Sequence, residues 1–384
     1  MAAPDVLLCM GTRPEIVKMA PVAHALAARG VPAGVLHTGQ HEDMAWPLYR
    51  FFDLEPAHRL DLARAGHGLA DLGARLLARL DAVLGAVRPR IVLVQGDTSS
   101  ALMAALAAFY RRIPVGHVEA GLRTHTPDEP FPEEMNRCLI ARIARWHFAP
   151  TLLARQNLMH EGIARSDITV TGNTVIDAVR SGVARLDAGQ AGPPPGLPGD
   201  LAARLAGRKL LLVTAHRREN WGAGITAIAR AVADLLTGDD RFAAVWPVHG
   251  NPLVADAVNT ALAGLAPAAA ARLVLTAPLD YPALLWLLRA CWLVLTDSGG
   301  IQEEACALAR PVLVLREATE RQALIAAGGG LLVGARRDAI VATTRALAGD
   351  AARYRTMQDC GAPFGDGHAG AAIAHLLAQE LEAG

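Results

Sequence analysis

Two acidic side chains follow consecutive apolar runs in the amino-terminal half of the sequence. Asp97 comes directly after RIVLVQG, and Glu119 lies near the end of PVGHVEA, one residue from a glycine. Consecutive parallel strands joined by one helix usually lie side by side, so we expect both carboxylates to face one site. Neighbouring carboxylates with separated pKa values can serve as an acid and a base. For Asp97 alone, capping of the following helix is a competing interpretation.

A second acidic pair, Glu133 and Glu134, lies in FPEEMNR. Pro132 suits the first turn of a helix, and acidic residues in that turn complement the helix dipole. The residues alone therefore favour a helix-start role over a catalytic one for both glutamates.

Cations and glycines gather at three other predicted strand ends. AHRREN, residues 215–220, places His216 and two arginines where a pyrophosphate can bind. In TDSGGIQEEA, residues 296–305, the backbone N–H groups of a helix start suit a phosphate, and glutamates one turn later can bind sugar hydroxyls. The turn GTRPEIVK, residues 11–18, offers Arg13 and Lys18 and lacks the glycines of a dinucleotide or P-loop fingerprint.

These turns must be positioned by a mostly parallel sheet, because short Val-, Leu- and Ile-rich runs alternate with amphipathic stretches. The predicted class is α/β, with two Rossmann-like doubly wound domains. Five strands are expected in each half: DVLLCM, AGVLHTG, RIVLVQGD, PVGHVEA and DITVTGN, then KLLLVTAH, AAVWPVHG, RLVLTAP, WLVLTDS and PVLVLRE.

We place the domain boundary near TGN, giving domains over residues 1–172 and 173–364, because the strand count balances there. The low-complexity segment 189–199, GQAGPPPGLPG, is the linker that composition alone would favour. A final helix begins at Ala369, and its docking is not evident from the pattern.

Composition excludes several classes of function. The 384 residues contain 37 basic and 37 acidic side chains, so no net field attracts nucleic acid or a membrane. The start of the chain does not have the pattern of a signal peptide, and its longest apolar stretch is shorter than a membrane span. Five cysteines lack CxxC spacing, and the histidines form no metal-binding pattern with carboxylates. We therefore expect a cytoplasmic protein with reduced cysteines, no metal and no cofactor.

Ten motifs in register resemble the non-hydrolysing UDP-N-acetylglucosamine 2-epimerases, from about residue 6 to the final helix. They are GTRPEIVKMAPV, TGQH, QGDT, IPVGHVEAGLRT, PEEMNR, TGNTVIDAV, AHRREN, VHGNP, DSGGIQEEA and ATERQ. The resemblance implies a glycosyltransferase-B-like fold with the active site in the interdomain cleft and a UDP-binding carboxyl-terminal domain. It also implies that the last helix, about 365–384, packs back on the first domain, and that the protein is a homodimer serving polysaccharide biosynthesis.

The chemistry implied by the resemblance is reversible interconversion of UDP-N-acetylglucosamine and UDP-N-acetylmannosamine. UDP is eliminated to give 2-acetamidoglucal and then added back, with the proton delivered to the opposite face of carbon 2. The implied catalytic residues are Asp97, Glu119, Glu133 and His216, which overrides the helix-start interpretation of Glu133. The implied substrate-binding residues are Arg13, Lys18, Ser298, Gly299, Gly300, Glu304 and Arg321. A second, activating UDP-sugar site would use Gln40, His41, Glu134, Arg137 and His249.

The sequence departs from the family pattern at two places. Leu284 stands where relatives often present an aromatic ring to uracil, and the stretches HEDMAWP and ARAGHGL differ near the second site. The alternatives are a hydrolysing 2-epimerase that releases UDP and N-acetylmannosamine, a glycosyltransferase of the same fold, and a catalytically silent sugar-nucleotide-binding regulator.

Overall fold

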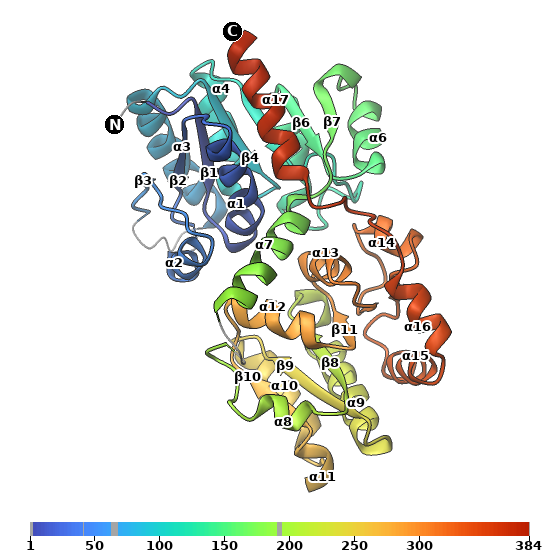
Figure 1. Ribbon diagram of the computed structural model, residues 1–384. Helices are drawn as coiled ribbons and strands as arrows, with labels where there is room; N and C mark the ends of the chain where they lie inside the picture. Colours follow the sequence, from blue (N-terminus) through green and yellow to red (C-terminus); the bar gives the residue numbers. More distant parts are fainter. Residues whose placement is uncertain (1–2, 41, 63–67, 190–193, 384) are drawn as a thin grey trace. The chain divides into compact units, whose positions relative to one another are not determined.

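The computed structural model describes residues 3–40, 42–62, 68–189 and 194–383. The chain forms two compact units, one comprising Met1–Ala178 with Phe364–Gly384 and the other Val179–Pro363 (Figure 1). Within the described ranges, no helix has the length and apolar character needed to cross a membrane.

The first unit is built on a seven-stranded parallel sheet with strand order β3-β2-β1-β4-β5-β6-β7. Its strands are β1 (Val6–Met10), β2 (Ala33–His37), β3 (His58–Arg59), β4 (Ile91–Gln95), β5 (Val115–Val118), β6 (Trp146–Ala149) and β7 (Ile168–Val170). Its helices are α1 (Arg13–Ala28), α2 (Glu42–Phe51), α3 (Gly68–Val87), α4 (Ser99–Tyr110), α5 (Glu133–Ile143), α6 (Leu152–His160) and α17 (Ala369–Ala383), and α7 (Thr174–Gly189) begins in it. Strands β1 and β4 are buried throughout, as expected for a parallel sheet covered on both faces.

The last segment of the chain belongs to the first unit, where α17 packs against α1 (Figure 1). A Cβ at Gly370 would come within 2.9 Å of the Pro21 backbone, so only glycine permits this close approach of the two helices. The Asp177 carboxylate accepts hydrogen bonds from the backbone N–H groups of Gly370 (2.9 Å) and Ala369 (3.3 Å) and so caps α17.

The second unit repeats the architecture with a six-stranded parallel sheet in the order β10-β9-β8-β11-β12-β13. Its strands are β8 (Lys209–Thr214), β9 (Phe242–Pro247), β10 (Leu273–Thr276), β11 (Leu293–Thr296), β12 (Val312–Val314) and β13 (Gly330–Leu332). Its helices are α8 (Leu201–Leu205), α9 (Ala223–Gly238), α10 (Pro252–Leu262), α11 (Pro267–Ala270), α12 (Tyr281–Ala290), α13 (Gly299–Ala307), α14 (Gln322–Ala326), α15 (Arg337–Gly349) and α16 (Ala351–Gln358). Buried side chains of α9 and of strands β8, β9 and β11 supply much of its core.

The predicted α/β class is confirmed, and all ten predicted strands are present. The structure adds β3, β6 and β13, which the sequence analysis missed. These strands have two to four residues, and β6 contains His147 among its apolar side chains, so their local signal was weak. The compact units change at residues 178 and 179, inside α7, while the boundary at 172 and 173 stays a prediction.

Candidate functional site

Each sheet has a point at which the direction of strand progression reverses, and in open α/β sheets ligands bind beyond the carboxyl ends of the strands there. In the first unit this point lies between β1 and β4, and in the second between β8 and β11. The segments that follow these four strands carry about half of the predicted site residues, among them Arg13, Asp97, His216 and Ser298.

A buried carboxylate joins the turns after β1 and β4. Glu15 accepts hydrogen bonds from the backbone N–H groups of Gly11 (2.9 Å) and Thr12 (2.7 Å), and from the Thr98 hydroxyl (2.6 Å). Burial raises the pKa of Glu15, against the opposing effect of these hydrogen bonds. The sequence analysis gave Glu15 no role, although a threonine followed three residues later by glutamate is the pattern of a capping box.

Glu119 is held by donors from three different elements. Its carboxylate accepts from Lys18 Nζ (2.5 Å), from Asn173 Nδ2 (3.0 Å) and from Gln95 Nε2. Its backbone φ of 64° lies in the left-handed region, which is unfavourable for a residue with a Cβ and is maintained only when surrounding contacts require it. The structure thus brings two predicted site residues, Glu119 and Lys18, into contact and places Gln95 and Asn173 beside them.

Asp97 follows β4 and does not cap the next helix. The cap of α4 is Thr98, whose hydroxyl accepts from the Ala101 backbone N–H (3.0 Å), so the capping interpretation of Asp97 is wrong. The Asp97 carboxylate forms an ion pair with Arg137 Nη2 (2.7 Å), and its carbonyl accepts from Asn136 (2.8 Å). Because β4 and β5 are paired, the turns that carry Asp97 and Glu119 leave the same sheet edge.

The start of α5 carries the two glutamates of FPEEMNR. Glu133 is the first helical residue and is half-buried, as the helix-start pattern predicts. Glu134 is buried, and its carboxylate accepts from the backbone N–H groups of Thr124 and His125, both at 3.0 Å. Its other oxygen lies 3.3 Å from Arg137 Nη1, so two residues predicted for the second site contact the Asp97 region.

The remaining residues predicted in the first unit lie near the same turns. Gln40 Oε1 accepts from the backbone N–H (3.2 Å) and hydroxyl (2.7 Å) of Ser100 in α4. Arg13 is half-buried at the first position of α1. His41 lies outside the described residues.

In the second unit one buried acid organises the turn after β8. The fully buried Asp297 carboxylate accepts from the backbone N–H groups of His216 (3.0 Å) and Arg217 (2.9 Å), and from Asn220 Nδ2 (2.9 Å). Strand pairing of β8 with β11 brings these turns together. Asp297 lies in the motif TDSGGIQEEA but was not among the predicted site residues.

His216 lies between that acid and a second histidine. Its Nδ1 is 3.3 Å from Asp297 Oδ1, and its ring stacks on His249 with centroids 6.2 Å apart and an interplanar angle of 19°. Burial lowers the pKa of His216, Arg217 and His249 act in the same direction, and Asp297 opposes them. A neutral imidazole is therefore favoured at pH 7. The structure places His249, predicted for the second site, against the predicted catalytic histidine.

The start of α13 is closely approached by an arginine. The N-cap is Ser298, and a Cβ at Gly299 would lie 3.0 Å from Arg321 Cζ and 2.8 Å from Glu320 Oε1, so a side chain there would require movement. Arg321 also donates from Nε to Glu303 Oε1 (3.0 Å).

Glu320 balances the arginines in this part of the second unit. It pairs with Arg321 (3.0 Å), Arg316 (2.8 Å) and Arg217 (3.7 Å). Burial by itself would raise the pKa of Glu320, but these three guanidinium groups lower it to about 2. Glu304 on α13 and Leu284 on α12 are both buried.

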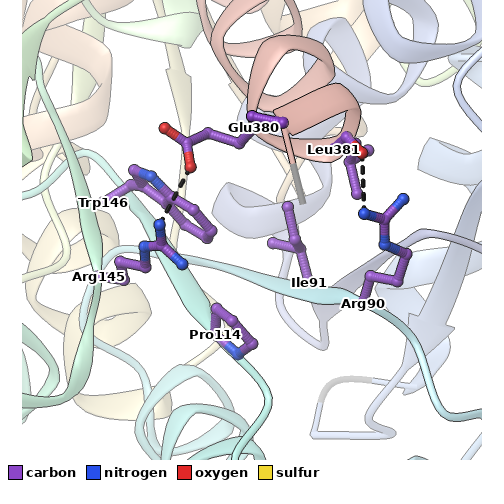
Figure 2. A pocket seen from close by; sticks show the side chains of 8 residues that line it. Arg90, Ile91, Pro114, Arg145, Trp146, Glu380 and Leu381 are labelled. Carbon is purple, nitrogen blue, oxygen red and sulfur yellow. Dashed lines mark hydrogen bonds and ion pairs between the residues drawn. The ribbon is translucent and has the colours of Figure 1, made fainter.

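A separate cavity of about 270 Å³ lies at the opposite, amino-terminal edge of the first sheet (Figure 2). Figure 2 shows Arg145 paired with Glu380 (3.2 Å) and Arg90 donating to the Leu381 carbonyl (2.8 Å). These arginines fasten α17 to the sheet, and the cavity contains none of the predicted site residues.

Taken one by one, the two units share a single plan: a doubly wound parallel sheet with the strand order of a dinucleotide-binding fold and polar residues beyond its switch point. Two such units in one chain define a glycosyltransferase-B-like α/β protein.

Comparison with known proteins gives the family. The family model described as UDP-N-acetylglucosamine 2-epimerase matches residues 24–378. The UDP-N-acetylglucosamine 2-epimerase of Escherichia coli (strain K12) is 43% identical over 380 residues, covering 97% of this chain and 98% of that protein. The chain therefore belongs to the UDP-N-acetylglucosamine 2-epimerase family.

Solved structures agree with this assignment. The Neisseria meningitidis UDP-GlcNAc 2-epimerase bound to UDP-GlcNAc has a TM-score of 0.88 and 37% identity, covering 97% of this chain and 99% of that one. The S. aureus MnaA-UDP co-structure has a TM-score of 0.88 and 34% identity, covering 99% and 97%. The resemblance and the fold class predicted from the sequence are confirmed.

Proposed function

We propose that this protein is an isomerase that interconverts UDP-N-acetylglucosamine and UDP-N-acetylmannosamine without net hydrolysis. The observation that carries the proposal is similarity over nearly the full length to 2-epimerases, including the Escherichia coli enzyme at 43% identity. The N. meningitidis relative is solved with UDP-GlcNAc and the S. aureus relative with UDP, which supports the substrate class.

The proposed reaction avoids direct removal of a weakly acidic proton. The hydrogen on carbon 2 is not adjacent to a carbonyl group, so a simple deprotonation would be very slow. Elimination removes that proton and breaks the bond between carbon 1 and the diphosphate oxygen, forming the double bond of 2-acetamidoglucal. Re-addition of UDP to carbon 1, with protonation of carbon 2 on the other face, gives the epimer.

The proton transfers are assigned to Asp97, Glu119 and Glu133 as a group. The contacts of Glu119 with Lys18, Gln95 and Asn173 favour an ionised carboxylate in a fixed orientation, which suits a base. Asp97 is likewise oriented by its ion pair with Arg137.

UDP is assigned to the second unit, and the carboxylates proposed to move the proton belong to the first unit. The backbone of Gly299 and Gly300 would bind the diphosphate at the start of α13, where the helix dipole favours negative charge. The other nucleotide-side residues in the proposal are Ser298, Glu304 and Arg321, with Arg13 and Lys18 supplying charge from the first unit. His216, whose pKa is lowered by burial, would contact the leaving phosphate, where negative charge develops.

The test is NMR of the wild-type protein with UDP-N-acetylglucosamine in deuterated water. We expect both epimers, deuterium at carbon 2 of recovered substrate, and no accumulation of free N-acetylmannosamine. Free sugar would identify the hydrolysing alternative, and an absence of deuterium would exclude the proton route. Asp97→Asn, Glu119→Gln and Glu133→Gln should each lower kcat by roughly 100-fold or more while UDP still binds.

A homodimer is also proposed, from the family resemblance and from exposed apolar side chains in the first unit. Met135 and Leu139 are each 45% exposed, four residues apart on α5, and Phe131 just before that helix is 66% exposed. Phe109 and Tyr110 are 58% and 63% exposed at the end of α4. Light scattering should give twice the chain mass of 40.4 kDa. Met135→Glu with Leu139→Glu should shift that mass toward the monomer.

The second UDP-sugar site remains a proposal built on Gln40, His41, Glu134, Arg137 and His249. Its support is that Arg137 contacts Asp97 within the first unit and that His249 stacks on His216 within the second. A sigmoidal dependence of velocity on UDP-N-acetylglucosamine that Arg137→Lys makes hyperbolic would support it.

A role in polysaccharide biosynthesis and a cytoplasmic location are further proposals, and the five free cysteines are consistent with a reducing compartment.

A further inference from the structure

We propose that Asn173 and Gln95 are positioning residues for the Glu119 carboxylate, and that Asn173 links this carboxylate to the segment at which the chain re-enters the first unit. The inference rests on the proposed function, in which Glu119 moves a proton. Neither amide is among the site residues that the sequence predicted.

The orientation of the Asn173 amide is fixed by its other contacts. Its Oδ1 accepts from the Val175 backbone N–H (3.1 Å) at the start of α7, so its Nδ2 must face Glu119 Oε1, 3.0 Å away. Asn173 is 1% exposed. Because a buried amide is costly unless its donors and acceptors are paired, this arrangement leaves little freedom to either side chain.

Gln95 approaches the same carboxylate from the neighbouring strand. It ends β4, directly opposite Val118 in the pairing with β5, and its Nε2 donates to Glu119 Oε2. An ideal Cβ at Gly96 would lie 3.9 Å from that oxygen, so Glu119 lies against the backbone that leads to Asp97. The two amides therefore fix one carboxylate oxygen each, and Lys18 supplies the charge.

Asn173 also contacts the returning chain. Its backbone N–H donates to the Phe364 carbonyl (2.7 Å), and Phe364 is the first residue of the chain after the second unit. A displacement of residue 364 is therefore transmitted through Asn173 to the Glu119 oxygen to which its side chain donates. The orientation of Glu119, the proposed base, therefore depends on the position of Phe364, where the chain returns from the second unit.

The experiment uses Asn173→Asp in the full-length protein. The aspartate keeps an oxygen that accepts from the Val175 N–H. Its second carboxylate oxygen replaces the NH2 group that donates to Glu119. Like charges at this distance disfavour ionisation, so the titration midpoint of Glu119 should rise by about one pH unit or more. Carbon-13 NMR of carboxyl-labelled glutamate, assigned by loss of one signal in Glu119→Gln, measures that midpoint without ligand.

Catalysis gives the second readout. In Asn173→Asp, kcat should fall by about 100-fold with the acid limb of its pH profile shifted upward, because a misplaced base loses this much. The KM for UDP-N-acetylglucosamine should stay within about threefold, since the diphosphate is assigned to Gly299 and Gly300 and neither amide is among the proposed UDP-binding residues. Gln95→Met, which removes only a donor, should lower kcat with a smaller shift of the midpoint.

Asp177→Asn is the matched control, because Asp177 lies in α7, which begins directly after Asn173 in the chain, and caps α17. It should change thermal stability and leave the Glu119 midpoint and the pH profile as in the wild type. The proposal is overturned if folded Asn173→Asp and Gln95→Met both keep the wild-type midpoint and kcat. A wild-type protein that does not epimerise would instead refute the proposed function, while the ligand-free titration would still decide the positioning role.

Discussion

At the scale of single residues, acidic side chains in this protein do two kinds of work. Glu15, Glu134 and Asp297 accept hydrogen bonds from backbone N–H groups and shape the turns that carry the site. Asp97 and Glu119 instead pair with cationic side chains and face the carboxyl end of the first sheet. Residue type does not distinguish these roles, because an acid after a strand suits either one.

Replacement of Asp297 by asparagine should weaken the whole turn of residues 215–220. The asparagine carries no charge, and in either orientation of its amide the NH2 group would face at least one of the N–H donors that now share the carboxylate. We expect the free energy of unfolding to fall by roughly 1–3 kcal/mol. UDP affinity should fall by about tenfold, the equivalent of one lost hydrogen bond to a charged group.

Calorimetric titration with UDP and chemical denaturation measure both effects. Asp256→Asn, at an exposed position of α10 in the same unit, is the control and should change neither quantity. Wild-type UDP affinity in Asp297→Asn would show that this turn does not bind the nucleotide.

At the scale of elements, the two passages of the chain through the first unit meet at a pair of glycines. Gly172 and Gly365 have φ angles of 84° and 103°, and a Cβ on Gly365 would lie 2.8 Å from Gly172 Cα. A side chain on either residue would separate the segment before α7 from the segment before α17. This contact also holds Asn173 against the Phe364 carbonyl.

Gly172→Ala should therefore lower the free energy of unfolding by more than the positive φ angle of this residue accounts for. Gly162 is the matched control, because it has the same φ of 84° in the same unit with nothing within 4 Å of an added Cβ. We expect Gly162→Ala to lower the free energy of unfolding by about 1 kcal/mol and Gly172→Ala by a further 1–3 kcal/mol, roughly. Denaturation curves of both variants give the difference, and equal losses would contradict the close contact.

The end of α13 and the segment after α16 bring two thiols together. Cys306 and Cys360 have their sulfur atoms 3.8 Å apart, and burial, followed by the neighbouring sulfur, raises the pKa of Cys306. Oxidation with a diazene such as diamide, which takes up the two hydrogens as a hydrazine, should join them in a disulfide. Peptide mapping should find this bridge, with the half-buried Cys138 left as a thiol. A bridge to any other cysteine would contradict the geometry.

At the scale of the whole molecule, acid should destabilise the first unit before its carboxylates are protonated. Burial lowers the pKa of His117 to about 3 and that of His147 to about 4, on the paired strands β5 and β6. The unfolded chain binds protons below about pH 6.5 while these histidines stay neutral in the fold. Their stabilising contribution is therefore present above pH 6.5 and is lost as pH falls toward 4 and 3.

Between pH 7.5 and pH 5, each of these histidines should lower the free energy of unfolding by roughly 2 kcal/mol, because only the unfolded chain is protonated there. Urea denaturation across this range should show an unfolding midpoint that falls as pH falls. Unfolding is monitored by tryptophan fluorescence, to which Trp146 on β6 contributes. His147→Gln should flatten the dependence, since glutamine does not titrate. A midpoint independent of pH between 7.5 and 5 would show that the histidines are not neutral in the folded protein.

Much of this molecule followed from local sequence pattern. Alternating apolar and amphipathic stretches identified ten strands and the α/β class, because side-chain periodicity and turn residues act over a few positions. Cap chemistry likewise predicted the acidic start of α5. The strands that were missed lack a Val-, Leu- and Ile-rich run: β3 is His-Arg, β6 is Trp-His-Phe-Ala and β13 is Gly-Leu-Leu. Their pairing with neighbouring strands completes the sheets.

The order of the motifs, and hence the family, was determined by the sequence by itself, since each motif is a continuous stretch of chain. Only the tertiary structure decided which groups hold the carboxylates. Asn173 reaches Glu119 across 54 positions, and Asp297 reaches the His216 backbone across 81. Such contacts depend on which strands are neighbours in a sheet and on backbone angles such as the positive φ of Glu119. The spacing of residues along the chain predicts neither the strand order nor these angles.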